Sequence, residues 1–392
     1  MKTARYTYCL YSLLVGLLLT SCGAESILRK ADQSYALGEY NEAAALYKKA
    51  YSKTEAKDKA KRAERAFKTA ECYRRINMNA KAMAAYRNAI RYNYPDSVMY
   101  KHMADLQLQK GEYKAAVQNY DIYLEYNPTD TTAINGKKAC TTAPQWKKNP
   151  TRYIVKKETF FNSRRSEYSP VYGSEDFGQL FFTSTRDKAL GEDKSLITGV
   201  KAPDIFFSTK DEKGKWQKPE PLEGEVNSEY EDGACAFTPD YKTMYFTRCL
   251  VDGEAPRSAQ IYKSTRSDAT WSAPTLCELA NDTISSFAHP AVSPDGAWLY
   301  FVSDMSGGMG GLDIWRIAIT GEEFGGVENL GAAINTQGNE MFPTFRPNGD
   351  LYFSSNGHHG MGGLDIYCAT QDEENRWSIT NLQAPVNSAN DD

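Results

Sequence analysis

The feature that most constrains this chain is an internal repeat that occurs four times in its second half. Four isoleucines at matching positions, Ile205, Ile261, Ile314 and Ile366, follow one another at intervals of 56, 53 and 52 residues. Each copy has an apolar first segment, a turn such as Pro294-Asp295-Gly296, an apolar-aromatic strand, an Asp-Ile or equivalent strand, and a last segment that starts near an aromatic residue. Four short antiparallel strands per copy at this period predict the blades of a β-propeller.

A different repeat fills the first half, and its spacing is helical. Small residues precede tyrosines by four positions, and these tyrosines lie 39 and then 34 residues apart. We expect glycines to form the tight turns between paired helices, alanines to let the helices approach, and tyrosines to fill the groove between them. The residues predicted to pack in this way are Gly38, Ala43, Tyr47, Ala82, Tyr86, Gly111, Ala116 and Tyr120.

The two repeats together predict a multidomain protein, α then β. An α-helical repeat solenoid is expected over residues 31–142 and a β-propeller over residues 151–392. Pro144 and Pro150 lie between them and indicate a short, stiff linker. A chain of 392 residues with 41% hydrophobic residues can bury the cores of two domains.

The first 21 residues have the features of an export signal. A basic start is followed by an apolar run over residues 10–19. The run ends in Leu19-Thr20-Ser21-Cys22, which resembles the lipobox of bacterial lipoproteins, whose cysteine is acylated and becomes the first mature residue. The resemblance implies a lipid anchor on Cys22, followed by a lipidated linker over residues 22–30. Only Glu25 lies close after Cys22, so there is no strong acidic surface-export tag, and the periplasmic face is favoured. The alternative is an ordinary signal peptide with an incidental cysteine.

The two halves carry opposite net charges. Residues 24–150 contain 23 Lys and Arg against 14 Asp and Glu, whereas residues 151–392 contain 21 against 36. The positive excess of the helical half indicates a solvated helix face, and the alternative is a docking surface for an acidic protein. Nucleic acid is not expected as a partner of an exported protein.

Six cysteines remain outside the signal and the lipobox. They show no metal-ligand spacing. Small buried side chains are the first interpretation, and disulfides, which export would permit, are the alternative. The six are Cys72, Cys140, Cys235, Cys249, Cys277 and Cys368.

The propeller half contains residues that could suggest chemistry. Two glycine-rich segments, residues 307–311 and 360–363, lead into strands rather than into a helix, so they predict tight strand connections and not a phosphate site. His358 and His359 have no carboxylate or cysteine at ligand spacing. We therefore predict no catalytic residue, no metal and no cofactor. Four acids recur at equivalent positions and are predicted to be structural: Asp204, Asp295, Asp313 and Asp365.

These motifs resemble known families. The Gly-Tyr-Ala-Tyr pattern of the helical half resembles tetratricopeptide repeats, and the four copies of the second half resemble TolB-type propeller repeats, with their Ser-Pro-Asp-Gly turn, Leu-Tyr-Phe strand and Asp-Ile-Tyr strand. The order of lipobox, helical repeats and propeller is similar to that of the PorE-like family of type IX secretion and gliding-associated outer-membrane lipoproteins. Members of that family continue into an OmpA-like peptidoglycan-binding domain, whose motif is absent from this sequence.

The resemblance implies a non-enzymatic scaffold that binds envelope and secretion-machinery proteins. Peptidoglycan would be reached only through a domain that this sequence lacks. The alternative is a surface lipoprotein whose propeller binds or processes glycans or peptides, and it predicts non-repeating acids around the propeller axis.

The ends of the propeller half lead to a further expectation. The last residues, 387–392, match the lead-ins of the second and fourth copies, residues 227–232 and 335–340. The segment Tyr153 to Phe161 matches the outer strand of a blade whose other strands come later in the sequence. We therefore expect a native propeller of about six blades, with at least one repeat encoded beyond Asp392.

Overall fold

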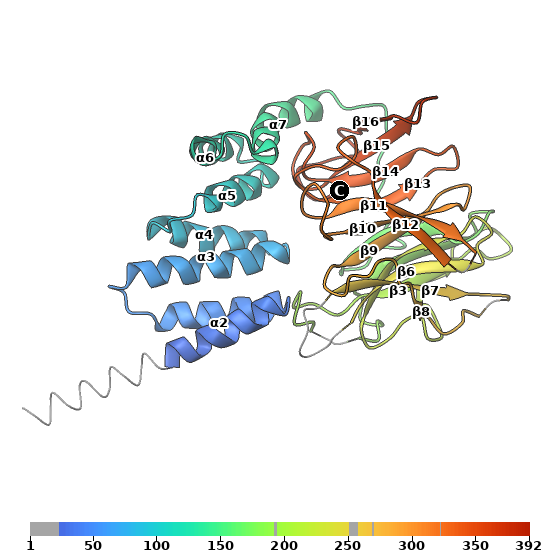
Figure 1. Ribbon diagram of the computed structural model, residues 1–392, viewed down its shortest axis with the longest axis horizontal. Helices are drawn as coiled ribbons and strands as arrows, with labels where there is room; N and C mark the ends of the chain where they lie inside the picture. The colour runs from blue at the N-terminus through green and yellow to red at the C-terminus, as the bar shows by residue number, and fades with distance from the viewer. Residues whose placement is uncertain (1–22, 192–193, 251–257, 269, 322) are drawn as a thin grey trace, which may run out of the picture. The chain divides into compact units, whose positions relative to one another are not determined.

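The computed structural model describes residues 23–392, apart from residues 192–193, 251–257, 269 and 322. Helices occupy the first part of the chain and four β-sheets the second (Figure 1). The predicted fold class, a helical-repeat solenoid followed by a β-propeller, is thereby confirmed. Contacts divide the chain into two compact units. One holds the chain as far as Met103 together with Ser195–Gly199, and the other holds α6, α7 and the four sheets.

The helices follow one another with short connections. Asn77 (φ 54°) ends the turn between two of them in the left-handed conformation that Gly38 (φ 78°) and Gly111 (φ 76°) adopt in the equivalent turns. The side chains of Asp58 and Asp130 accept backbone N–H groups at two helix starts. After a helix over residues 23–36 come α2 (Tyr40–Lys53), α3 (Lys59–Arg75), α4 (Asn79–Arg91), α5 (Val98–Gln109), α6 (Tyr113–Tyr126) and α7 (Thr131–Lys148).

Helical structure extends further than the sequence indicated at both ends of this region. Residues 23–30, which were expected to lie in a lipidated linker, form the start of the first helix, where Glu25 pairs with the buried Arg65 over 3.0 Å. At the other end α7 continues to Lys148 with Pro144 inside it, so residues 143–148 are helix and not linker. The proline removes one helical N–H, and the burial of Ala143 beside Met361 offsets that loss.

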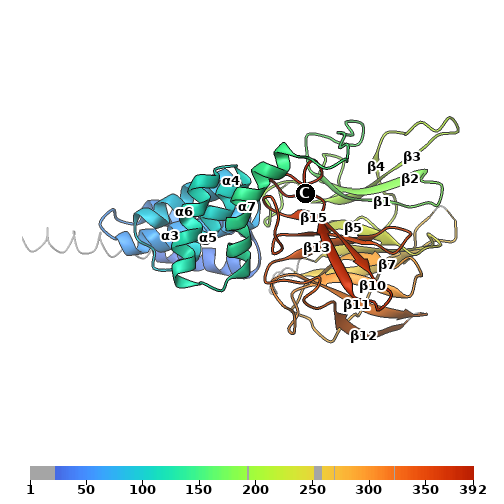
Figure 2. The same ribbon diagram turned by 90° about the horizontal axis from the view of Figure 1, so that it is seen from above.

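The second part of the chain folds into four antiparallel sheets of four strands, each a simple meander (Figure 2). We call them blades 1 to 4. Blade 1 holds β1 (Glu167–Tyr172), β2 (Gln179–Ser184), β3 (Asp204–Thr209) and β4 (Glu220–Pro221), and blade 2 holds β5 (Glu231–Phe237), β6 (Thr243–Cys249), β7 (Ala259–Thr265) and β8 (Thr275–Leu276). Blade 3 holds β9 (Phe287–Val292), β10 (Trp298–Ser303), β11 (Asp313–Thr320) and β12 (Glu323–Asn329), and blade 4 holds β13 (Glu340–Phe345), β14 (Leu351–Ser355), β15 (Asp365–Gln371) and β16 (Trp377–Asn381).

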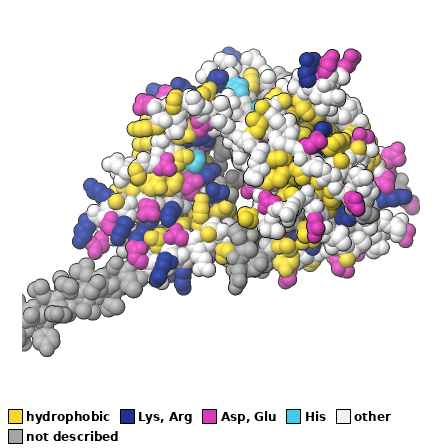
Figure 3. Space-filling model, in the orientation of Figure 1, with side chains coloured by type: hydrophobic (Ala, Val, Ile, Leu, Met, Phe, Trp, Pro, Cys, Tyr) yellow, Lys and Arg dark blue, Asp and Glu magenta, His cyan; other side chains and the backbone are white. Residues whose placement is uncertain are grey.

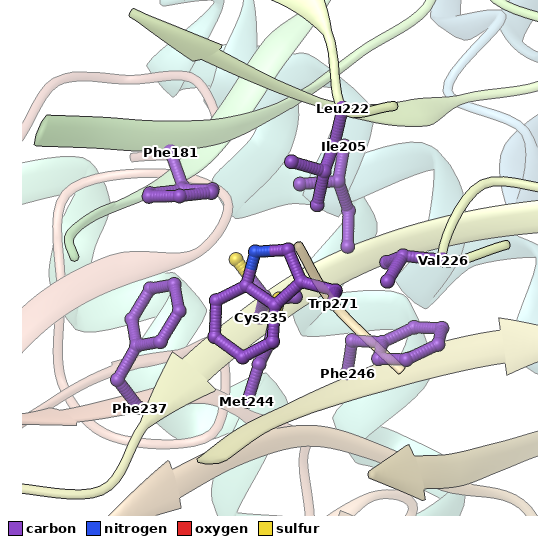
Figure 4. Close-up of a cluster of buried hydrophobic side chains, with 9 residues drawn as sticks. All are labelled: Phe181, Ile205, Leu222, Val226, Cys235, Phe237, Met244, Phe246 and Trp271. Carbon is purple, nitrogen blue, oxygen red and sulfur yellow. The ribbon is translucent and has the colours of Figure 1, made fainter. Parts of the chain in front are cut away.

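Apolar side chains between neighbouring blades form the propeller core. The ring of Phe181 in blade 1 lies 4.9 Å from that of Phe237 in blade 2, and the equivalent rings of Tyr300 and Phe345 join blades 3 and 4 at 4.8 Å. Burying such a side chain contributes about 1.5–3 kcal/mol. The first of these clusters contains Phe181, Ile205, Leu222, Val226, Cys235, Phe237, Met244, Phe246 and Trp271 (Figure 4).

The first strand of every blade carries the same irregularity. Its pairing with the second strand shifts register in all four blades. The residue at the shift has a positive φ, between 45° and 53°, a conformation that residues other than glycine rarely adopt. In two blades the N–H of this residue donates to a threonine of the preceding blade: Ala234 to Thr183 Oγ1 over 2.8 Å and His289 to Thr247 Oγ1 over 2.9 Å. The four residues are Ser169, Ala234, His289 and Phe342.

The segment Tyr153 to Phe161 contains no strand in the described structure, and its side chains are mostly exposed. Its pairing with a further blade, and the total number of blades, stay predictions.

Candidate functional site

Each helical repeat contains a hydrogen bond between a tyrosine and an acid that lies fifteen residues earlier. The tyrosine rings are almost completely buried, with at most 1% of each side chain exposed. A buried phenol needs a partner for its hydroxyl, which the acid on the preceding helix supplies. The three pairs are Asp32 with Tyr47, Glu71 with Tyr86, and Asp105 with Tyr120.

The residues that the sequence assigned to helix packing lie around these bonds. The three alanines are fully buried, and the two glycines occupy the turns. The acids were missed, although an acid fifteen residues before each repeat tyrosine is a signal that the sequence contains. The assigned residues are Gly38, Ala43, Tyr47, Ala82, Tyr86, Gly111, Ala116 and Tyr120.

Glu71 is the most highly connected of these acids. It accepts hydrogen bonds from Tyr86 and from Arg74 Nη2 at 2.9 Å, and it lies 2.7 Å from His102 Nδ1. Burial opposes ionisation of Glu71, but the hydrogen bond and charge of His102, together with Arg74, outweigh it and hold the pKa of Glu71 well below its usual range. The second repeat therefore has an ionised network in its interior.

Basic side chains on the helices lie over tyrosine rings rather than in one patch. The guanidinium of Arg75 lies 5.7 Å from the ring of Tyr35 and 5.2 Å from that of Tyr40, and Lys81 Nζ lies 5.3 Å from the ring of Tyr73. Lys and Arg are interspersed with Asp and Glu on the visible helix faces (Figure 3). The surface therefore offers cationic and aromatic groups together, a combination suited to protein contacts.

In the propeller, three of the four predicted structural acids begin the third strand of a blade. We call Asp204, Asp313 and Asp365 the third-strand aspartates. Each is at most 1% exposed, and its Oδ2 accepts the N–H of the loop that precedes the strand: Leu190 at 2.6 Å, Met309, and Met361 at 2.7 Å. Burial, only partly offset by these amides, raises the pKa of Asp204 to about 6 and that of Asp365 to about 7.

One glycine of each glycine-rich segment lies against its third-strand aspartate. A β-carbon at Gly308 would collide with Asp313 Oδ2, and one at Gly360 would collide with Asp365 Oδ2. The loops therefore fold around a carboxylate of their own blade and enter a strand, as the sequence predicted, and they do not precede a helix.

Asp295, the fourth predicted acid, lies apart from these three in an exposed turn. Its Oδ1 accepts the hydroxyl of Ser293 at 2.5 Å and the N–H of Ala297 at 3.0 Å. The hydrogen bond from Ser293, and then the one from Ala297, lower the pKa of Asp295. This is a turn-capping arrangement.

Side chains of the first strands form an aromatic cluster that the sequence analysis missed. The first strands of consecutive blades contact one another, as strands around a propeller axis do. The ring of Phe342 stacks on His289 at 3.9 Å and lies edge-on to Tyr168 at 6.3 Å. Burial lowers the pKa of His289 to about 4, so the imidazole is neutral at physiological pH. We call these three residues the axial cluster.

The two adjacent histidines hold structure together. His358 Nε2 lies 2.8 Å from the carbonyl of Ile334, and His359 Nε2 lies 3.0 Å from Thr142 Oγ1 while its ring packs edge-on against Trp146. Among the described residues, no group of three or more His, Cys, Asp or Glu side chains could hold a metal ion.

The six cysteines of the described chain are all free, and four of them are buried. Burial raises the pKa of the Cys72, Cys235 and Cys277 thiols to about 12, so they are protonated at neutral pH. Cys22 lies outside the described residues. No helix within the described ranges is both long and apolar enough to cross a membrane.

Comparison with known proteins gives structural similarities at low identity. Neither the known family models nor the curated proteins contain a match to this sequence. The tetratricopeptide-repeat domain of an FK506-binding protein from Plasmodium falciparum matches 33% of this chain and 94% of its own, at 15% identity and a TM-score of 0.30. The β-propeller domain of the Trilobed protease from Pyrococcus furiosus matches 55% of this chain and 51% of its own, at 10% identity and a TM-score of 0.29. An α-L-arabinofuranosidase from Lactobacillus brevis matches 57% of this chain and 78% of its own, at 12% identity and a TM-score of 0.35. Similarities this weak say nothing about activity.

Proposed function

We propose that this protein is a non-enzymatic scaffold, held at the outer membrane by a lipid on Cys22, that binds other envelope proteins through its helical repeats and its propeller. Within that role we propose a place in the type IX secretion machinery, as the resemblance to PorE-like lipoproteins implies. Contact with peptidoglycan is not assigned to any residue of this sequence.

The observation that carries the proposal is the hydrogen bonding of the recurring propeller acids. The recurring aspartates bind loop and turn amides of their own blades. A propeller hydrolase instead needs non-repeating carboxylates around its axis. The four bulge residues of the first strands are Ser169, Ala234, His289 and Phe342, and none of them is acidic.

Affinity capture of the lipoprotein from detergent-solubilised envelopes tests the proposal. We expect to recover envelope and secretion proteins after cross-linking, and we expect the charge reversals Arg75→Glu and Lys81→Glu to reduce that recovery. Lys213→Glu, in an exposed propeller turn, is the matched control and should leave recovery unchanged. Recovery of the protein alone would count against the scaffold.

The lipid anchor has its own test. Cys22→Ser removes the thiol that would be acylated, so the variant should accumulate unprocessed or fractionate as soluble protein. Metabolic labelling with a clickable fatty acid should mark the unchanged protein and not the variant. A variant that still fractionates with membranes would mean that protein contacts suffice or that the lipobox interpretation is wrong.

A second candidate function is supported by the axial cluster. Aromatic rings near a propeller axis can stack on sugars or on peptide side chains. If the propeller binds glycans or peptides, Phe342→Ala should abolish that binding while Phe160→Ala, at an exposed ring outside the cluster, should not. Screening both variants on glycan and peptide arrays, with hydrolysis products measured in parallel, separates binding from processing.

A further inference from the structure

Acidic residues are brought together in pairs by backbone hydrogen bonds that join one blade to the segment after it. The N–H of Glu340 donates to the carbonyl of Leu312 over 2.7 Å, which places the first acid of blade 4 directly beside Asp313 of blade 3. The same backbone bond joins Asp232 to Pro203, beside Asp204, at 3.0 Å, and Asp392 to Leu364, beside Asp365, at 2.8 Å. Each third-strand aspartate that the structure describes therefore has an acid of the following segment as its neighbour.

The two acids of a pair occur together or not at all. At the junction of blades 2 and 3, Gln260 takes the aspartate position and Phe287 takes the position of the second acid, as the strand registers show. That junction buries a core of its own, so neither acid is needed for two blades to pack. Joint presence and joint absence are what two groups that share a ligand would show.

One oxygen of each third-strand aspartate is left without a partner. Asp313 Oδ2 accepts N–H groups from Met309 and from Asn329, whose Nδ2 lies at 3.1 Å, whereas its buried Oδ1 has no hydrogen-bond partner in the described structure. Asp204 Oδ1 and Asp365 Oδ1 share this condition. A buried carboxylate oxygen without a partner is costly.

Glu340 adds a second buried carboxyl group at the junction of blades 3 and 4. Glu340 is fully buried, and its Oε1 accepts the hydroxyls of Thr336 at 2.7 Å and Ser355 at 2.6 Å. In the junction of blades 1 and 2, Arg248 stands where Ser355 stands here, and its Nε donates to Asp232 over 2.6 Å. No Lys or Arg of the described chain forms an ion pair with Asp313 or Glu340, so this junction lacks the cation that its counterpart has.

We propose that Asp313 and Glu340 bind a hard divalent cation, of the Ca²⁺ or Mg²⁺ class, between blades 3 and 4. The oxygens at this junction are those of the two carboxyl groups and of the Thr336 and Ser355 hydroxyls, and hard divalent cations prefer such oxygen ligands. Two carboxylates balance the charge of one divalent cation, and water or backbone oxygens complete the shell. The pair of Asp365 and Asp392 is the equivalent site one junction further on.

Thermal unfolding and metal analysis of the full chain test the proposal. After treatment with EDTA, we expect millimolar Ca²⁺ or Mg²⁺, each added alone at about pH 8 where ordinary carboxyls are ionised, to raise the melting temperature by several degrees. Elemental analysis after dialysis should find bound metal, and Asp313→Asn should remove one equivalent of it and part of the temperature shift. Asp295→Asn, the same change in an exposed turn, is the control and should keep both.

Several outcomes would overturn the site. These are the absence of bound metal and of any temperature shift, or full retention of both in Asp313→Asn. A third overturning result would show that the two acids share a proton instead of a cation. In that case Asp313→Asn raises the melting temperature in EDTA, while neither metal changes the melting temperature of the unchanged protein. If Asp313→Asn fails to fold, Glu340→Gln replaces it, because it keeps the shape of the side chain and removes its charge.

Discussion

The helical repeats and the propeller both place acids at repeating positions, but they surround them differently. In the helices, burial of Glu71 is outweighed by His102 and Arg74, and burial of Asp32 is outweighed by Lys68 and Tyr47, so both pKa values lie below the usual range. In the propeller, burial of Asp204 and Asp365 prevails over the loop amides and raises the pKa to about 6 and about 7. The same residue type is held charged in one region and driven toward neutrality in the other.

This difference gives the two sets of acids opposite responses to pH. A carboxyl whose pKa is lowered by folding stabilises the fold above its unfolded pKa, and this contribution is lost as the pH falls through the folded value. A carboxyl whose pKa is raised by folding stabilises fully below its unfolded pKa, and this contribution is lost as the pH rises through the folded value. Acidification should therefore remove the stability that Glu71 and Asp32 contribute and relieve the cost of ionising Asp204 and Asp365.

The largest effect should come from removing a repeat tyrosine. Tyr86→Ala deletes a fully buried ring and leaves Glu71 without its phenol, so we expect a loss of about 3–5 kcal/mol in the free energy of unfolding of the helical region. Chemical denaturation followed by circular dichroism at helical wavelengths measures it. Tyr126→Ala, at a ring that is 70% exposed, is the control and should change stability by less than about 0.5 kcal/mol. Unchanged stability in Tyr86→Ala would mean that the ring is not part of the core.

Next in size is the loss of the charge on Glu71. Glu71→Gln keeps the shape but weakens the bonds with His102 and Arg74, and hydrogen bonds to charged groups contribute about 1.5–3 kcal/mol each. We expect a destabilisation of about 2 kcal/mol at neutral pH that shrinks as the pH falls below about 4, where carboxyls become protonated. A loss of stability that does not depend on pH would show that packing, and not the charge, is what Glu71 contributes.

The opposite sign is expected in blade 1. Asp204→Asn keeps an acceptor for the N–H of Leu190 and puts an N–H₂ group where Oδ1 has no partner, beside Asp232. Because the folded pKa of Asp204 is about 6, ionisation costs stability as the pH rises from about 4 through 6, and the variant escapes that cost. We expect it to be more stable than the unchanged protein by about 1–2 kcal/mol at pH 7.5 and equal to it near pH 4. Thermal melts at the two pH values measure the difference, and a destabilised variant at pH 7.5 would contradict the burial argument.

The repeat periods were enough to predict most of the fold. Spacing of Ile205, Ile261, Ile314 and Ile366 placed the third strand of every blade, because a residue that recurs at a blade period occupies one position in the sheet. Tyrosines spaced by 39 and 34 residues likewise placed the second helix of each pair. Pro144 predicts a linker, yet α7 passes through it because tertiary packing of Ala143 outweighs local propensity.

In the propeller, what was missed involves residues brought together from different copies. The pairing of Asp313 with Glu340 depends on a loop of one blade lying against the lead-in of the next, and no single copy contains both groups. The axial cluster draws Tyr168, His289 and Phe342 from three blades, at positions that differ in type from copy to copy. A repeat pattern shows only the residues that the copies share, so contacts between residues that differ from copy to copy leave no signal in it.

The smallest expected effect concerns an exposed acid of the propeller. It tests whether the direction of a carboxyl's pKa shift depends on the fold around it or on its burial. Asp295 belongs to the propeller, yet it is exposed, and the hydroxyl of Ser293 with the N–H of Ala297 lowers its pKa as in the helical acids. If burial is the cause, Asp295→Ala should lose about 0.5–1 kcal/mol at neutral pH, the usual contribution of such hydrogen bonds, and the loss should fade as the pH falls below about 4. Asp240→Ala, in the matching turn of blade 2 where Thr238 and Lys242 bind the carboxylate, should behave alike. Thermal melts between about pH 3 and 7.5 distinguish the two explanations. If both variants were instead more stable than the unchanged protein at neutral pH, as expected for Asp204→Asn, the propeller fold itself and not burial would be the cause.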